Sequence, residues 1–106
     1  MINYEQFSQI ELRVATILSA ERVEGSEKLL RLRVSLNEDA RQIIAGIGKK
    51  YAPEELAGRQ IVIVANLEPR MLMGMESQGM LLAADSPDGP VILMPREEVP
   101  SGTKIK

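Results

Sequence analysis

The chain has 106 residues and a formal net charge of −2, and it contains neither cysteine nor histidine. This length is typical of one domain spanning residues 1–106. The missing residue types exclude disulfides and thiol nucleophiles and argue against zinc sites and histidine-based catalysts, so we expect a non-enzymatic protein without a cofactor. The absence of cysteine also favours a cytoplasmic protein. No apolar run approaches the ~20 residues of a membrane-spanning helix, so we expect no membrane partner.

Short apolar segments separated by turn residues predict a β protein. The clearest, Lys28–Leu36, alternates so that its apolar residues point to one face and Arg31 and Arg33 to the other. Residues 60–65 form a continuous apolar run, which predicts a strand buried on both faces. We expect strands at residues 12–23, 28–36, 41–46, 60–65, 79–84 and 91–94.

Two short helical segments are expected. Residues 3–9 predict a turn that packs Tyr4 or Phe7 against the core, and Pro53 followed by two glutamates predicts a helix that Gly58 ends. One small helix between the third and fourth strands, with no βαβ rhythm, predicts an all-β protein. This helix placement is that of a five-stranded oligonucleotide/oligosaccharide-binding barrel, the OB-fold. Residues 95–106 predict an extended C-terminal tail.

The connection that follows residue 65 is long and chemically distinctive. It holds Asn66, a Pro69-Arg70 pair and the run from Ser77 to Met80. Long ordered connections tend to be functional, so we place the functional surface here or beside it. The polar side chains of Asn66 and Ser77 could meet a ribose or a phosphate, or they could hold the connection together internally. The residues alone leave both interpretations open.

Three methionines, Met71, Met73 and Met75, occupy every second position within this connection. We interpret them as one face of an extended segment that packs into the core or into a subunit interface, because methionine adapts to irregular apolar surfaces. Exposed as a cluster, they would instead form an apolar patch that calls for a partner.

Positive charge is concentrated in the middle of the chain. Lys28–Arg70 carries eight basic and five acidic residues, a net charge of +3, whereas the remainder carries −5. Arg31 and Arg33 could form a basic stripe with Arg13 on a neighbouring strand. The Lys49-Lys50 pair of the GIGKKY segment could face a phosphate backbone, although solvated surface charge explains the same residues. Only three aromatic residues are present, so any nucleic acid should be bound by its folded shape rather than by base stacking.

Four collinear motifs resemble one known family. They are LRVATILSAERVEGSEKLLRLRV, IIAGIGKKYAPEEL, VIVANLEPR and ESQGMLLAA. From about Phe7 to its end, the chain resembles the tRNA-binding domain family, which includes free-standing dimeric tRNA-binding proteins and the C-terminal domain or beta subunit of methionyl-tRNA synthetase. The resemblance implies an OB-fold with a C-terminal extension, a homodimer, and shape-specific tRNA binding without catalysis. It makes methionyl-tRNA synthetase a candidate partner, and the start at Met1 favours a free-standing protein or a beta subunit.

The resemblance also implies site residues. The family's lysine before the second strand falls on Lys28, and its Asn-Leu-x-Pro-Arg motif includes Asn66 and Arg70. Its Ser-x-Gly-Met motif includes Ser77 and Met80. Together with the basic residues above, the expected tRNA-binding residues are Lys28, Arg31, Arg33, Lys49, Lys50, Asn66, Arg70, Ser77 and Met80, and the expected dimer interface is Met71, Met73 and Met75.

Two departures from the family pattern keep an alternative function open. Relatives often carry a lysine before the proline and a second basic residue after the arginine, where this chain has Glu68 and Met71. Both lower the positive charge of the loop and weaken the case for tRNA contact there. A chaperone-like, peptide-binding dimer on the same fold would use the Met71–Met75 surface as an apolar groove. A module that docks onto a synthetase is a third possibility.

Overall fold

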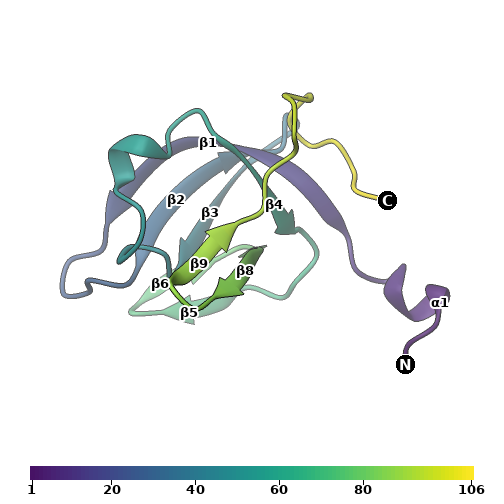
Figure 1. The fold of residues 1–106 in the computed structure, drawn as a ribbon, viewed down its shortest axis with the longest axis horizontal. Coiled ribbons are helices and arrows are strands. Elements are labelled where there is room, and N and C mark those ends of the chain that lie inside the picture. Colours follow the sequence, from purple (N-terminus) through teal and green to yellow (C-terminus); the bar gives the residue numbers. More distant parts are fainter.

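The protein is built around one antiparallel sheet that curls into a nearly closed barrel, as the computed structural model of residues 1–106 shows (Figure 1). The elements are α1 (Tyr4–Phe7), β1 (Leu12–Arg22), β2 (Leu30–Ser35), β3 (Ala40–Ala45), the 3₁₀ helix η1 (Pro53–Glu55), β4 (Gln60–Val64), β5 (Arg70–Leu72), β6 (Met75–Ser77), β7 (Met80–Leu81), β8 (Ala83–Ser86) and β9 (Gly89–Ile92). The strand order of the main sheet is β3-β2-β1-β4-β7, and β5–β6 and β8–β9 are separate hairpins. The expected five-stranded OB-type barrel is therefore confirmed. Neither helical segment is long and apolar enough to cross a membrane.

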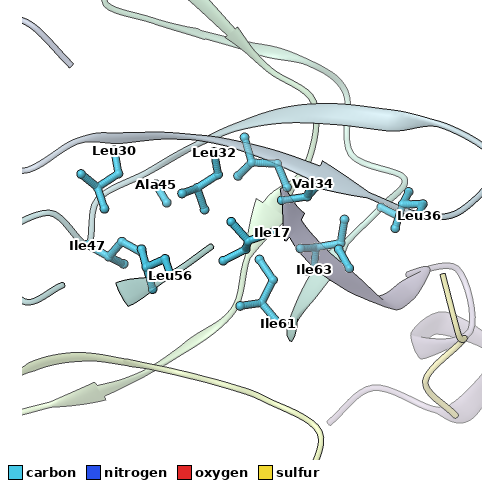
Figure 2. Close-up of a cluster of buried hydrophobic side chains, with 13 residues drawn as sticks. Ile17, Leu30, Leu32, Val34, Leu36, Ala45, Ile47, Leu56, Ile61 and Ile63 are labelled. Atoms are coloured by element: carbon cyan, nitrogen blue, oxygen red, sulfur yellow. The ribbon is translucent and has the colours of Figure 1, made fainter. Parts of the chain in front are cut away.

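The core lies inside the curled sheet and follows the alternation of β2. Leu30, Leu32 and Val34 are fully buried, while the arginines between them are exposed. Strand β4 is buried almost throughout, as its apolar run predicted. The 13 buried residues of the cluster in Figure 2 include Leu56, which follows η1 and fills the space beside Ile47. Each such aliphatic side chain stabilises the fold by roughly 1.5–3 kcal/mol relative to exposure.

Strand β1 is long because it serves two partners. Residues 12–16 pair with β4, and residues 16–22 pair with β2. The register with β2 shifts between Ile17 and Ser19, which leaves Leu18 exposed next to the buried Ile17.

The C-terminal segment pairs with the part of β1 that β2 does not reach. The N–H of Gly102 donates to the carbonyl of Val14 (2.7 Å), and the N–H of Ile105 donates to the carbonyl of Leu12 (2.9 Å). The N–H of Val14 donates in turn to the carbonyl of Thr103 (2.8 Å). Because an open strand edge leaves backbone groups without partners, this docking completes the sheet there. The expected tail is thus an ordered extension.

Three expectations about local structure are wrong. Tyr4 and Phe7 do not pack against the core, since their side chains are 82% and 41% exposed and α1 projects away from the barrel (Figure 1). The methionine-bearing part of the connection after residue 65 is not one extended segment, because the chain reverses in the β5–β6 hairpin. The strand expected at residues 79–84 is divided at Leu82, whose N–H and carbonyl bond to Val62 and Leu93 instead of continuing one ladder.

Candidate nucleic-acid interface

The outer face of β2 carries two of the expected basic residues. Arg31 and Arg33 are exposed, and they lie opposite Glu21 and Ser19 of β1. Arg31 forms an ion pair with Glu21, whereas Arg33 has no ion-pair partner. Part of the charge expected on this face is therefore already neutralised. In OB-folds this strand face and the loops beside it are where oligonucleotides bind.

Arg13 does not belong to this basic stripe, contrary to the sequence-based expectation. Its guanidinium is only slightly exposed and lies 2.6 Å from the Glu38 carboxylate, and its Nε donates to the carbonyl of Gly102 (2.9 Å). The hydrogen bond to Glu38 raises the pKa of Arg13, and the same bond lowers the pKa of the Glu38 carboxyl. Arg13 therefore holds the C-terminal extension and the β2–β3 turn against β1.

Three lysines from two loops, Lys28, Lys49 and Lys50, line one hollow of about 420 Å³. The loop before β2 and the loop after β3 are joined by backbone contacts. The N–H of Gly48 donates to the carbonyl of Lys28 (2.7 Å), and Arg22 Nη1 donates to the carbonyl of Gly48 (2.8 Å). A Cβ at position 48 would lie 3.0 Å from the Lys28 carbonyl oxygen, so this approach requires glycine. The structure thus brings the lysines of the two loops together.

Asn66 and Ser77 hold the fold together in this structure. Asn66 Oδ1 accepts the N–H of Glu11 (2.8 Å) and Nδ2 donates to the carbonyl of Gln9 (2.7 Å), which ties the segment after α1 to the end of β4. Ser77 is 4% exposed, and its Oγ accepts the N–H of Ile44 (3.0 Å). These contacts match the internal role left open above, and tRNA contact by either residue stays a prediction.

Arg70, Ser77 and Met80 surround a second, much smaller cavity of about 50 Å³ beside Ile44 of β3. Arg70 and Met80 are exposed, and Glu68 lies on the same rim. The structure therefore divides the expected tRNA-binding residues into the outer face of β2, the lysine hollow and this rim, while Asn66 lies apart from all three, in the hollow beside α1.

The methionines do not share one face of an extended segment, because the chain reverses among them. Met73 and Gly74 have φ of +49° and +78° and form the two-residue turn between β5 and β6. Met71 is 64% exposed, Met73 is 57% exposed and Met75 is half-buried opposite Leu72. Their place in a dimer interface stays a prediction. The Met73 methyl lies beside the loop before β2, 3.6 Å from where a Cβ on Gly25 would stand.

Sequence reasoning missed the contribution of the β8–β9 turn. Asp88, Gly89 and Pro90 line the lysine hollow, although the sequence indicated only a turn there. No local signal connects these residues with lysines about 40 to 60 positions earlier. Their placement depends on how β9 packs beside η1 and Tyr51, whose hydroxyl accepts the N–H of Ile92 (3.2 Å).

Comparisons with known proteins show which family this chain resembles. A family model described as "Putative tRNA binding domain" matches residues 12–104. Methionine–tRNA ligase of Methanothrix thermoacetophila is 57% identical over 106 residues, which cover 100% of this chain and 16% of the ligase. The chain thus spans about one sixth of the length of the curated relatives it matches.

Two solved structures are similar over their whole length. A methionyl-tRNA synthetase-related protein from Pyrococcus horikoshii has a TM-score of 0.94 and 34% identity, covering 100% of this chain and 98% of that one. The chaperone CsaA from Bacillus anthracis has a TM-score of 0.92 and 37% identity, covering 100% and 99%.

Proposed function

Because the chain belongs to the tRNA-binding domain family, we propose that it binds tRNA through the outer face of β2 and the adjoining lysine hollow. The observation that carries this proposal is that Lys28, Lys49 and Lys50 line one hollow. Lys28 lies in the loop directly before β2, the strand that carries Arg33. Phosphate contacts from such residues supply most of the affinity of nonspecific nucleic-acid binding.

Recognition should depend on the folded shape of the RNA. Base stacking needs exposed aromatic side chains near the basic surface. Tyr51 is half-buried and its hydroxyl is bonded to the backbone of β9, while Tyr4 and Phe7 lie on the projecting α1. With no stacking platform beside the lysines, the backbone geometry of a folded tRNA is what this surface can distinguish.

We further propose that the protein acts as a homodimer. A four-residue helix has little stability of its own, and α1 buries none of its residues in the monomer. Ile2, Tyr4, Phe7 and Ile10 are all exposed there, beside a hollow shared with Ile105. A second copy that covers this apolar surface would stabilise α1. The exposed methionine hairpin is the other candidate interface. Light scattering of Phe7→Glu and Met73→Glu variants distinguishes the two, because only a substitution at the interface should yield monomers.

The biological setting follows from the relatives. We propose that this domain acts on tRNA either by itself or as the tRNA-binding part of a methionine–tRNA ligase, in the cytoplasm where aminoacylation takes place. No catalytic step is assigned to its residues.

Filter binding of folded tRNA at several salt concentrations tests the proposal, with single-stranded and duplex RNA as controls. We expect tRNA to bind more tightly than either control, with affinity falling steeply as salt rises. The Arg31→Gln and Arg33→Gln variants should weaken all tRNAs alike, while Arg96→Gln removes the same charge elsewhere and should change little. Absence of binding at low salt would contradict the proposal, and a changed preference among tRNAs would contradict shape recognition.

A second function is favoured by one observation, the exposure of Met71 and Met73 at the β5–β6 hairpin. An exposed methionine cluster suits the binding of varied apolar peptide segments, and the similar structure from B. anthracis is described as a chaperone. If this function holds, the chain should slow aggregation of an unfolded protein, and a Met71→Ser/Met73→Ser variant should lose that effect while keeping tRNA affinity.

A further inference from the structure

We propose that the lysine hollow is a discrete phosphate-binding pocket and that Asp88, on its rim, limits the affinity of that pocket. This inference rests on the proposed function, since it says where a phosphate of the RNA is held and what opposes its binding. It concerns Lys28, Lys49 and Lys50 from two loops of the barrel and the β8–β9 turn that faces them.

The aliphatic parts of two of the lysines run close over glycines, which leave room for them. A Cβ on Gly46 would lie 3.0 Å from Lys28 Cε, so the aliphatic part of Lys28 crosses directly over this residue. A Cβ on Gly89 would lie 3.4 Å from Lys50 Cδ, so the aliphatic part of Lys50 crosses the β8–β9 turn. Lysine stems packed against the chain keep their ammonium groups at the solvent boundary. Such pre-positioning lowers the entropy lost when an anion binds.

The three ammonium groups have no counter-ion in the protein. The four ion pairs of the molecule involve Arg13, Arg31 and Arg41, and none involves a lysine of the hollow. A phosphate that enters the hollow is attracted by these lysines without having to break an ion pair first. Arg31, by contrast, must leave Glu21 before it can bind a phosphate.

The lining of the hollow selects phosphate over a nucleobase. Besides the lysines it consists of Gly46, Ile47, Asp88, Gly89 and Pro90, with no aromatic or amide side chain. Unpaired bases are recognised largely by stacking on aromatic side chains or guanidinium planes, which these residues do not supply. A backbone phosphate needs only charge and space.

Asp88 is the one carboxylate on the lining. Its backbone N–H donates to Ser86 Oγ (3.2 Å), which fixes the turn, while its side chain is exposed and forms no ion pair. A carboxylate at this place repels the phosphate that the lysines attract. For exposed charge pairs this effect corresponds to about a two- to fivefold change in affinity.

A nuclear magnetic resonance titration of the 106-residue chain with inorganic pyrophosphate tests the pocket without RNA. We expect shifts of backbone amides at residues 46–50 and 88–89 that saturate, and that are lost in a Lys49→Gln/Lys50→Gln variant. Shifts spread over all basic residues, or none in these loops, would overturn the pocket whatever tRNA does.

Filter binding of tRNA then tests the role of Asp88. Asp88→Asn should bind about two- to fivefold more tightly at low salt, and the gain should shrink as salt rises. Asp85→Asn, which removes the same charge from strand β8 of the same hairpin outside the hollow, is the matched control. The Lys49→Gln/Lys50→Gln variant should lose at least about tenfold in affinity and show a salt slope shallower by about one to two.

The two proposals fail differently. If tRNA binds but the lysine variant equals wild type, the pocket is wrong, and tRNA binding stands with the outer face of β2 as its remaining site. If pyrophosphate shifts the pocket amides but tRNA does not bind, the pocket stands and the proposed function is wrong. If Asp88→Asn gains no more than Asp85→Asn, the limiting role of Asp88 is wrong.

Discussion

Replacement of Ser77 by alanine separates a structural role from a direct role in RNA binding. The substitution removes an Oγ that accepts the buried N–H of Ile44 and donates to the carbonyl of Gly79 (3.1 Å). No other acceptor is in place for the Ile44 amide, and an unsatisfied buried donor costs about 1–3 kcal/mol. For a domain of this size, that loss lowers the melting temperature by about 5–15 °C.

Thermal and urea unfolding of the Ser77→Ala variant provide the measurement, followed by tRNA filter binding well below its melting temperature. The control is Ser19→Ala, because Ser19 is exposed on β1 and makes no side-chain hydrogen bond, so its stability should change by no more than about 0.5 kcal/mol. We expect the tRNA affinity of the folded Ser77→Ala protein to lie within about twofold of wild type, a change no larger than the loss of one weak contact would cause. An unchanged stability, or a large loss of tRNA affinity in the folded variant, would refute this reasoning.

Two further predictions concern the C-terminal extension and its support. Gly102→Ala should destabilise the fold by at least about 2 kcal/mol, as measured by urea unfolding. The φ of Gly102 is +87°, and a Cβ there would collide with the Leu36 carbonyl and stand 2.7 Å from Arg13 Nη2. The control is Gly58→Ala, which should destabilise the fold less because Gly58 has a similar φ but open space around it. Glu38→Gln should be less stable than wild type at pH 7, because the bond from Arg13 lowers the pKa of this carboxyl below 4.5 and therefore stabilises the fold only while the carboxylate is ionised. The stability difference between the variant and wild type should narrow as the pH falls below 4.5. A stability difference that stays constant into strong acid would contradict the role of the Arg13–Glu38 ion pair.

The barrel was predictable because its strands carry their own signals. The alternation of Leu30, Leu32 and Val34 identifies both the strand and its buried face. The apolar run of β4 indicates burial on both sides, and Pro53 marks the helical turn that brings Leu56 to the core. Such features depend on neighbouring residues only, so a single sequence contains them.

The remaining features depend on contacts between distant segments. Arg13 has the pattern of an outward-facing strand arginine, and nothing nearby indicates that Glu38 and Gly102 will enclose it. The turn at Met73-Gly74 was missed because the usual sequence signal of a two-residue hairpin turn is asparagine or aspartate before glycine, and this turn has methionine there. The lysine hollow is likewise formed only when the β8–β9 turn reaches the loop after β3.

The docking of residues 102–105 along β1 also determines where the polypeptide leaves the barrel. Residues 104–106 line the same hollow as Tyr4 and Phe7, so the C-terminal segment lies beside α1. In Figure 1 both ends lie at one extreme of the long axis, and the loop before β2 lies at the other. Any polypeptide joined at either end would therefore be directed away from the lysines. Attachment through the first or the last residue would leave the lysine hollow open to solvent.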